Sequence, residues 1–321
     1  MEPATGTVSR SFSMVARDGE GTSRPSWMQV SLLTTLAPPP THIKKTPGLL
    51  GGGKSANAKI ASIQIFAENG QEAFDHSVMA FKIAEDHRVV LPTIVNLDGF
   101  ILTHVVEAHE MLDQETVDRF LPALKPYHKL DVHKPVTMGA FAMPELYTEC
   151  KMAHQMALTN AYGPILEIWK EWGELTGRVY KPVETYRTEG AKVIIMMMGS
   201  LAEVAETAVD AMRDKGMPVG LVKIRLWRPF PFADLRAALA GAELVIVCDR
   251  ALSLGGAAGP VQAEVRSAMY PLAQKPHILG YAVGLGGRDV QPEAFEDLVR
   301  HAQAEVKQGP SQEFYIYGVR G

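Results

Sequence analysis

The chain has 321 residues, of which 46% are hydrophobic and 21% are charged, and its formal net charge is −4. This balance is typical of a folded globular protein and not of a disordered chain. The small net charge gives no global field that would favour nucleic acid or an acidic membrane. No apolar run approaches the ~20 residues of a membrane-spanning helix. At about 150 residues per domain, the length predicts two domains.

The two cysteines, Cys150 and Cys248, are too few for a disulfide framework. This count indicates a reduced, cytoplasmic compartment. They are also too few for an iron–sulfur cluster, which is typically held by four thiolates. If the protein takes part in electron transfer, its redox centres are therefore expected on another chain.

Residues 1–59 differ in composition from the rest of the chain. They are rich in Ser, Thr, Gly and Pro and sustain no helical or strand period, which predicts an irregular or poorly ordered segment. Within it, Gly48–Ser55 (GLLGGGKS) matches the P-loop pattern. A P-loop requires a preceding strand and a following helix. The proline-rich stretch before the match favours a flexible loop, and a nucleotide-binding P-loop is kept as the weak alternative.

From residue 60 onward, apolar periodicity predicts regular elements. Ile60–Phe66 alternates as a strand does, and Glu72–Ala84 has the spacing of an amphipathic helix. Val89–Val95 is a near-continuous apolar run, as expected of a strand covered on both faces. The next predicted elements are a helix over Glu115–Leu121, a loop over Pro122–Pro144, a helix over Glu145–Trp172 with Met152 and Met156 on its apolar face, and a linker over Thr176–Glu189.

The second half of the chain alternates strands with helices. Ser200 and Glu203 have the spacing of a capping box at the start of a helix. The predicted strands are Val193–Met198, Val219–Leu226, Leu244–Cys248 and His277–Val283, and the other predicted helices are Phe232–Leu239, Pro260–Met269 and one that Pro292 opens. This alternation predicts an α/β fold with a mainly parallel sheet.

Sites in parallel α/β sheets gather beyond the carboxyl ends of the strands. This rule selects four segments: Asp98–His104, Arg228–Phe232, Asp249–Gly256 and Gly284–Asp289. The first is a polar loop that contains glycine, and we select Asp98 and His104 as site-proximal residues. His104 and His109 are five residues apart and do not share a helical face, which argues against a metal site there.

The other segments have a structural and a functional interpretation each. Arg228 could bind an anion or tie its turn to a neighbouring carbonyl or carboxylate, and we favour the structural role. The glycines of Gly284–Asp289 could approach a phosphate or form a tight turn, and we favour the turn.

Several strings of residues resemble the alpha subunits of 2-oxoacid:ferredoxin oxidoreductases, and most nearly those of the pyruvate:ferredoxin type. The strings are Ile63–Asp75 (IQIFAENGQEAFD), Leu91-Pro92, Asn96–His104, Arg225–Pro231, Asp249-Arg250 and Gly284–Asp289. They occur in order and with the family's spacing over residues 61–321. Their agreement is more specific than any one motif alone.

The resemblance implies a thiamine diphosphate enzyme that decarboxylates a 2-oxoacid, forms an acyl-coenzyme A and passes electrons through iron–sulfur clusters to ferredoxin. It implies a pyrimidine-binding-like domain, for which we expect residues 60–175, and a transketolase C-terminal-like domain over 190–307, followed by a tail over 308–321. The magnesium–diphosphate motif and the clusters are expected on beta-, gamma- and delta-type partner subunits. The chain is therefore expected to be inactive alone, with no nucleic-acid or membrane partner.

The sequence also departs from the family pattern. Family alpha chains open with a Tyr-Pro-Ile-Thr-Pro motif whose Thr contacts substrate, and a later Glu bonds the aminopyrimidine ring of the cofactor. Residues 1–60 contain neither. About half of the pyrimidine domain is therefore expected to be missing or replaced, and no catalytic residue is assigned. Two functions stay open: an alpha subunit with an altered start, or a non-catalytic structural subunit or remnant of such a complex.

Overall fold

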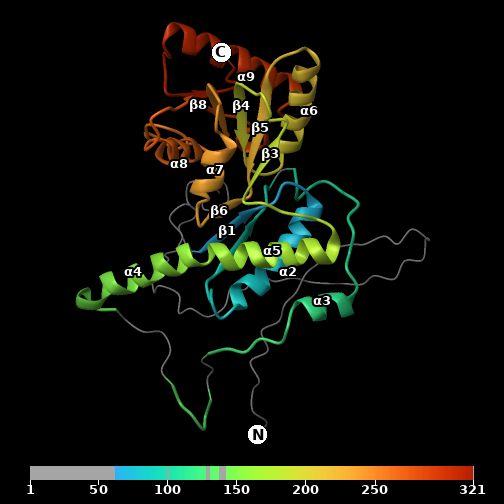
Figure 1. Cartoon of the computed structure of the whole chain (residues 1–321), viewed down its shortest axis with the longest axis vertical. Coiled ribbons are helices and arrows are strands. Elements are labelled where there is room, and N and C mark those ends of the chain that lie inside the picture. The colour runs from blue at the N-terminus through green and yellow to red at the C-terminus, as the bar shows by residue number, and fades with distance from the viewer. Residues whose placement is uncertain (1–61, 100, 128–130, 137–141, 321) are drawn as a thin grey trace, which may run out of the picture.

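The computed structural model describes residues 62–99, 101–127, 131–136 and 142–320. The segment 1–59 and its P-loop match at Gly48–Ser55 lie outside the described residues. The described residues form a three-stranded sheet of order β2-β1-β6 and a six-stranded sheet of order β3-β5-β4-β7-β8-β9. Figure 1 shows the larger sheet above the smaller one along the long axis. The α/β fold class is confirmed.

The smaller sheet is centred on β1 (Ile63–Phe66), which pairs in parallel with β2 (Thr93–Asn96) and antiparallel with β6 (Leu226–Arg228). The strand predicted over Val89–Val95 is present as β2, but it starts later than predicted and is not covered on both faces. Regular pairing begins only at Thr93, and the rest of β2 is half-buried. The physical reason is that β2 is an edge strand of this sheet within the described part of the chain.

One core lies between the smaller sheet and the helices α2 (Gly70–Glu85), α3 (Gln114–Phe120) and α5 (Tyr162–Thr176). At its centre Trp172 is fully buried, and its ring meets the ring of Phe120 edge-on at 4.9 Å between centroids. The core therefore links α3 to α5 through aromatic packing.

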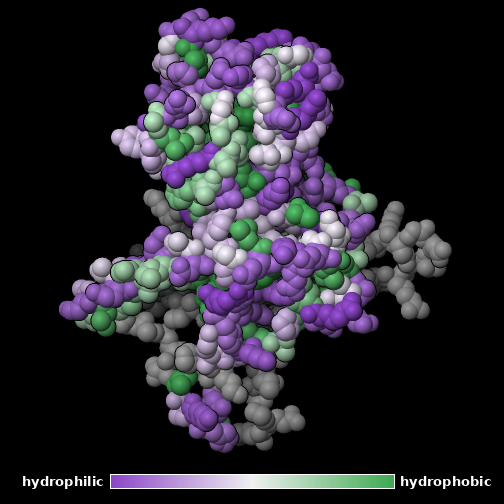
Figure 2. Space-filling view, in the orientation of Figure 1, coloured by the Kyte–Doolittle hydropathy of each residue, from purple (hydrophilic) through white to green (hydrophobic). Residues whose placement is uncertain are grey.

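The predicted helix over Glu145–Trp172 is two helices. Ala161 separates α4 (Pro144–Asn160) from α5, and α4 contains no buried residue. It projects sideways from the body of the molecule (Figure 1). Met152 and Met156, predicted on the apolar face of this helix, are 63% and 52% exposed. Figure 2 shows hydrophobic side chains interspersed with hydrophilic ones along this helix.

The larger sheet is parallel between all neighbouring strands except β3 and β5. Its strands are β3 (Val183–Tyr186), β4 (Val193–Met197), β5 (Val219–Ile224), β7 (Leu244–Asp249), β8 (His277–Ala282) and β9 (Phe314–Ile316). β3 lies inside the predicted linker Thr176–Glu189, so that interpretation was wrong. Pairing with the well-formed edge of β5 overrides the weak local strand signal of this segment.

Helices cover both faces of the larger sheet, as expected of parallel strands. They are α6 (Leu201–Asp214) and α9 (Pro292–Gln308) on one face and α7 (Phe232–Ala238) and α8 (Pro260–Met269) on the other. Successive residues of β4 point alternately into these two cores, so that Ile195 faces α6 and Met196 faces α8. A short 3₁₀ turn, η1 (Leu285–Gly287), follows β8.

The predicted strand over Val219–Leu226 passes from one sheet to the other. It divides into β5 of the larger sheet and β6 of the smaller one, with Arg225 between them. Leu226 packs in the core of the smaller sheet, whereas Trp227 packs in a core of the larger sheet. In the described part of the chain, no helix combines the length and apolar character needed to cross a membrane.

The capping box predicted for Ser200 and Glu203 is not formed. Ser200 is the N-cap of α6, but its side chain makes no capping hydrogen bond and instead accepts one from Arg250 at 3.2 Å. Glu203 accepts a hydrogen bond from Asn69 Nδ2 at 2.8 Å. Both side chains instead contact residues that are distant in sequence, and a local sequence pattern does not reveal such partners.

Candidate functional site at the junction of the two sheets

The carboxyl ends of β1 and of the central strands of the larger sheet meet at one junction. The amide of Phe66, the last residue of β1, donates to the Arg225 carbonyl at 2.8 Å. The Ala67 carbonyl lies 3.7 Å from where a Cβ on Gly199 would be. Gly199 follows β4, so this is the edge of the sheet at which sites in α/β proteins gather.

Two acidic and two basic side chains are buried together at this junction. Glu68 and Glu72 come from the turn after β1 and the first turn of α2, and Lys223 and Arg225 come from the end of β5. Lys223 Nζ lies 3.0 Å from Glu68, and Arg225 Nη2 lies 2.5 Å from Glu72. Within this quartet the smaller unit contributes the two carboxylates and the larger unit contributes the two cations, so the pairs join the units. Buried ion pairs of this kind fix geometry more than they add stability.

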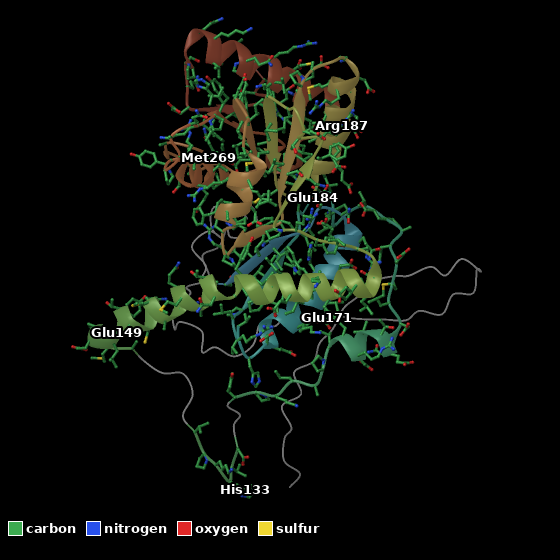
Figure 3. All side chains as sticks on the ribbon, in the orientation of Figure 1. His133, Glu149, Glu171, Glu184, Arg187 and Met269 are labelled. Atoms are coloured by element: carbon green, nitrogen blue, oxygen red, sulfur yellow. The ribbon has the colours of Figure 1, made fainter. Side chains whose placement is uncertain are left out.

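Two further carboxylates border this quartet on the side of the larger sheet. Glu184 of β3 lies 2.6 Å from Arg225 Nη2, and Glu206 of α6 lies 2.7 Å from Lys223 Nζ. Their side chains are 38% and 29% exposed, against 8% for Glu68. Figure 3 shows Glu184 at the end of the larger sheet that faces the smaller one. We call these six residues the junction cluster.

Burial shapes the ionisation of this region. Burial raises the pKa of Glu68 to about 7, although Lys223 acts to lower it. Burial also holds the pKa of His76 well below its usual range, and the charge of Arg225 acts in the same direction. His76 is fully buried between the rings of Trp169 and Tyr180. Its imidazole is therefore neutral at physiological pH.

A second polar group gathers around Arg250, just after β7. Arg250 Nη1 lies 3.4 Å from Asp98 Oδ1 and 3.2 Å from the Ser200 hydroxyl. Its Nε is 3.4 Å from where a Cβ on Gly284 would be. Asp98 also accepts hydrogen bonds from the amide of Ile101 at 2.7 Å and from the next amide. The structure therefore brings together three of the predicted strand-end segments.

His104 lies apart from this group, on the surface. Its Nδ1 contacts the Thr103 hydroxyl at 2.9 Å, and its side chain is exposed. His109 is half-buried with its ring 6.3 Å from that of Phe74. Asp98 is thus an anchor of its loop, whereas His104 is carried on the exposed part of the same loop.

The remaining predicted segments have structural roles. Arg228 donates to Glu264 at 2.6 Å and to the Trp227 carbonyl, which ties β6 to α8. Asp249 accepts from the amides of the first turn of α8. Gly284 has φ +63°, in the left-handed region that glycine adopts readily, so the turn after β8 requires it.

Sequence reasoning missed the junction cluster. Glu68, Glu72 and Arg225 all lie within strings that carry the family resemblance, but their pairing spans more than 150 residues of sequence. One local signal was present. Lys223 and Arg225 interrupt the apolar run VGLVKIRL, and charged residues in a buried strand require partners.

Comparison with known proteins assigns both halves of the chain. Residues 55–168 match the model of the pyruvate flavodoxin/ferredoxin oxidoreductase thiamine diphosphate-binding domain. Residues 191–295 match pyruvate:ferredoxin oxidoreductase core domain II. The pyruvate synthase subunit PorA of Methanothermobacter thermautotrophicus is 39% identical over 243 residues, 75% of this chain and 62% of that protein. The chain belongs to the alpha subunits of the 2-oxoacid:ferredoxin oxidoreductases.

A second PorA subunit has a similar level of identity to this chain. The PorA subunit of Thermotoga maritima is 43% identical over 242 residues, 74% of this chain and 62% of that protein. A solved 2-oxoglutarate:ferredoxin oxidoreductase from Magnetococcus marinus aligns over 75% of this chain and 42% of its own, at 18% identity and a TM-score of 0.48. This alpha-subunit chain therefore spans less than two thirds of the length of the PorA proteins it matches.

In this alpha subunit, Asp98→Ala is expected to release the loop that carries His104. The variant loses two amide hydrogen bonds and the contact with Arg250, and hydrogen bonds to charged groups contribute about 1.5–3 kcal/mol. Amide exchange should rise both in the loop and in the turn after β7 that contains Arg250. The matched control is Asp113→Ala, which removes a similar bond to the Thr116 amide on exposed α3 and should affect α3 alone. Unchanged exchange around Arg250 in Asp98→Ala would contradict the anchor.

Proposed function

We propose that the chain is the alpha subunit of a thiamine diphosphate-dependent oxidoreductase that converts a 2-oxoacid, with pyruvate as the substrate, and coenzyme A to acyl-coenzyme A and carbon dioxide. The electrons pass to ferredoxin. The observation that carries this proposal is the ordered match of two family domains over residues 55–168 and 191–295, together with relatives named pyruvate synthase subunit PorA. We assign it to the cytoplasm.

The described residues do not supply a complete cofactor site. No group of three or more His, Cys, Asp or Glu side chains in the described ranges could hold a metal ion. A cavity of about 380 Å³, lined by Arg266, Tyr270 and His277 among others, opens beside the amino end of β8. The junction lies at the opposite edge of that sheet. We therefore assign the magnesium and the diphosphate contacts to a beta-type partner subunit and derive no chemical step through the cofactor.

Electron transfer likewise requires other chains in this proposal. Cys150 is exposed on α4 and Cys248 is buried in β7, so the two thiols do not form one site. Iron–sulfur clusters, which typically take four thiolates, are assigned to gamma- and delta-type subunits. The role left to this chain is to build one wall of the active site. In that role, Asp98 positions the loop that presents His104 toward the partner.

A non-catalytic structural subunit is the second candidate. The observation that favours it is the side-chain inventory at the junction, where every member of the junction cluster is engaged in an ion pair within the chain. Side chains that pair with one another to hold the two units together are not available to contact a substrate. A structural subunit would retain the surfaces that join the complex without contributing to the reaction.

The purified full-length chain is expected to show no coenzyme A- and 2-oxoacid-dependent reduction of ferredoxin or of a dye. Co-expression with candidate beta, gamma and delta subunits should give a complex that turns over. Association without turnover would favour the structural subunit, whereas failure to associate would contradict both proposals. Turnover by the isolated chain would contradict the assignment of the cofactor contacts to a partner.

A further inference from the structure

The cavity of about 380 Å³ lies at the edge of the larger sheet where its parallel strands begin, opposite the junction cluster. Its walls come from the second half of α8, the first residues of β8, the last turn of α9 and the tail that follows α9. Small-molecule sites are typically clefts of about 300–1,000 Å³ that are mostly apolar and contain a few polar groups. The cavity is of this size, and the function proposed above makes no use of it.

The inner wall of the cavity is apolar. Met269, which comes from α8 (Figure 3), and Leu279 of β8 are only 2% and 3% exposed. Ile278 and Val306 line the cavity beside them and are partly buried. An apolar cavity of about 150 Å³ is already large enough to bind benzene. The inner wall therefore offers room for an aromatic ring or a branched aliphatic chain.

Hydrogen bonds hold the walls of the cavity in place. Arg266 of α8 donates to the Ile278 carbonyl at 2.8 Å and to the Glu313 carboxylate at 2.5 Å. The side-chain amide of Gln262 donates to the Glu313 carbonyl at 2.8 Å. These bonds join α8, β8 and the tail around the cavity, so a ligand would enter a site that is already formed. They also neutralise the charge of Glu313 with that of Arg266.

Two groups at the mouth of the cavity have polar atoms to offer a ligand. Lys275 Nζ lies 4.9 Å from the ring centroid of Tyr270, which is 76% exposed, and His277 lines the cavity next to them. Within the part of the chain that the structure describes, neither the Lys275 ammonium nor the His277 ring has an ion pair or a hydrogen bond. The lining thus holds two cations, Arg266 and Lys275, against one carboxylate, and the uncompensated charge is on Lys275.

We propose that this cavity binds a small carboxylic acid with an apolar body, whose carboxylate pairs with Lys275 and His277 while the body lies on Met269 and Leu279. One uncompensated positive charge matches a monoanion. A neutral ligand would leave Lys275 without a partner, and a compact inorganic anion would leave the apolar wall uncovered. The proposal is independent of the reaction assigned to the chain.

Occupancy of the cavity should be visible in two segments that are distant in sequence. The lining includes Pro310 and Glu313 of the tail as well as residues of α8 and β8. A ligand inside the cavity would contact both walls, so it should slow amide exchange of peptides spanning 266–279 and 309–316 together. An ion bound only to the exposed lysine would not protect the tail.

The test adds four probes to the full-length chain at neutral pH. Phenylpropionate and isocaproate carry a carboxylate on an aromatic and on a branched body, phenylpropanamide is the neutral counterpart of the first, and inorganic phosphate has no apolar body. Calorimetry measures affinity at millimolar probe, and amide exchange locates the site. Lys275→Met removes the ammonium group and keeps the apolar stem. The matched control is Lys192→Met, at the same edge of the sheet, where Lys192 pairs with Glu243 outside the cavity.

We expect at least one of the two acids to bind and to protect both peptides, with the amide and phosphate at least about tenfold weaker. Lys275→Met should weaken binding of the acid about tenfold, and Lys192→Met should leave it unchanged. Both lysines are exposed, so both variants should fold. Equal affinities for acid and amide, or an unchanged affinity in Lys275→Met, would overturn the proposal. So would failure of both acids to bind, or protection that leaves out either peptide.

Discussion

Replacing Arg225 with methionine is expected to lower the stability of the chain more than any other single change at the junction. Methionine keeps the apolar stem of the side chain but removes the guanidinium that lies 2.5 Å from Glu72 and 2.6 Å from Glu184. Removing one partner of a buried pair leaves an uncompensated charge and costs about 3–5 kcal/mol. The melting temperature should fall by about 10 °C, at roughly 2–4 °C per kcal/mol for a chain of this size.

Arg88→Met is the matched control for this change. Arg88 also pairs with two carboxylates, Asp86 and Glu167, but its side chain is 54% exposed. Exposed pairs contribute about 0–1 kcal/mol. If differential scanning fluorimetry gives equal shifts for the two variants, the junction cluster is not buried in solution as it is in the structure.

Trp172→Ala is expected to damage the core of the smaller sheet to a similar degree. Trp172 is 0% exposed and packs against Phe120, so the change leaves a cavity between α3 and α5. Substitutions of a buried tryptophan by alanine typically cost about 3–5 kcal/mol, and a loss of this size is expected here.

The control for the tryptophan variant lies on the same helix. Leu175 is 41% exposed, and Leu175→Ala removes an apolar side chain of α5 that fills no core position. Its effect should remain within about 0.5 kcal/mol, as is usual for surface changes. Chemical denaturation monitored by circular dichroism measures both. A Trp172→Ala chain as stable as Leu175→Ala would contradict the position of Trp172 in the core.

Most elements of the larger sheet could be predicted from sequence because their strands are buried on both faces. The run over Leu244–Cys248 and the helix Pro260–Met269 agree with β7 and α8 to within one residue. Such segments have long apolar runs or a clear helical period, together with Pro or Gly at their ends. Local sequence is enough to predict the bounds of an element whose environment is the same along its whole length.

The errors fall where tertiary contacts decide. The segment Val183–Tyr186 has alternating polar residues and becomes a strand only because β5 offers it a free edge. The apolar side chains of α4 have helical spacing, yet Met152 and Met156 are 63% and 52% exposed. Hydrophobic periodicity predicts that a helix has an apolar face, but it does not predict what covers that face.

In the candidate site, too, some residues could be predicted from local sequence and others depend on tertiary contacts. Asp98 could be selected because it follows a strand, and the structure adds its partner Arg250, some 150 residues later in the chain. The junction cluster could not be predicted, since nothing in the local sequence of Glu68 or Glu72 identifies which cations they meet. Only Lys223 and Arg225 gave a local signal, as charges within an apolar strand.

The position of β6 has a consequence for the order in which the chain can fold during synthesis. The central strand of the smaller sheet, β1, ends at Phe66, but its antiparallel neighbour begins only at Leu226. Ribosomes add about 5–20 residues per second. The edge of β1 that pairs with β6 therefore lacks this partner for on the order of ten seconds or more, until β6 has been synthesised. During that interval the nascent chain presents an open strand to its surroundings, which makes this stage of synthesis the one at which a chaperone would matter most.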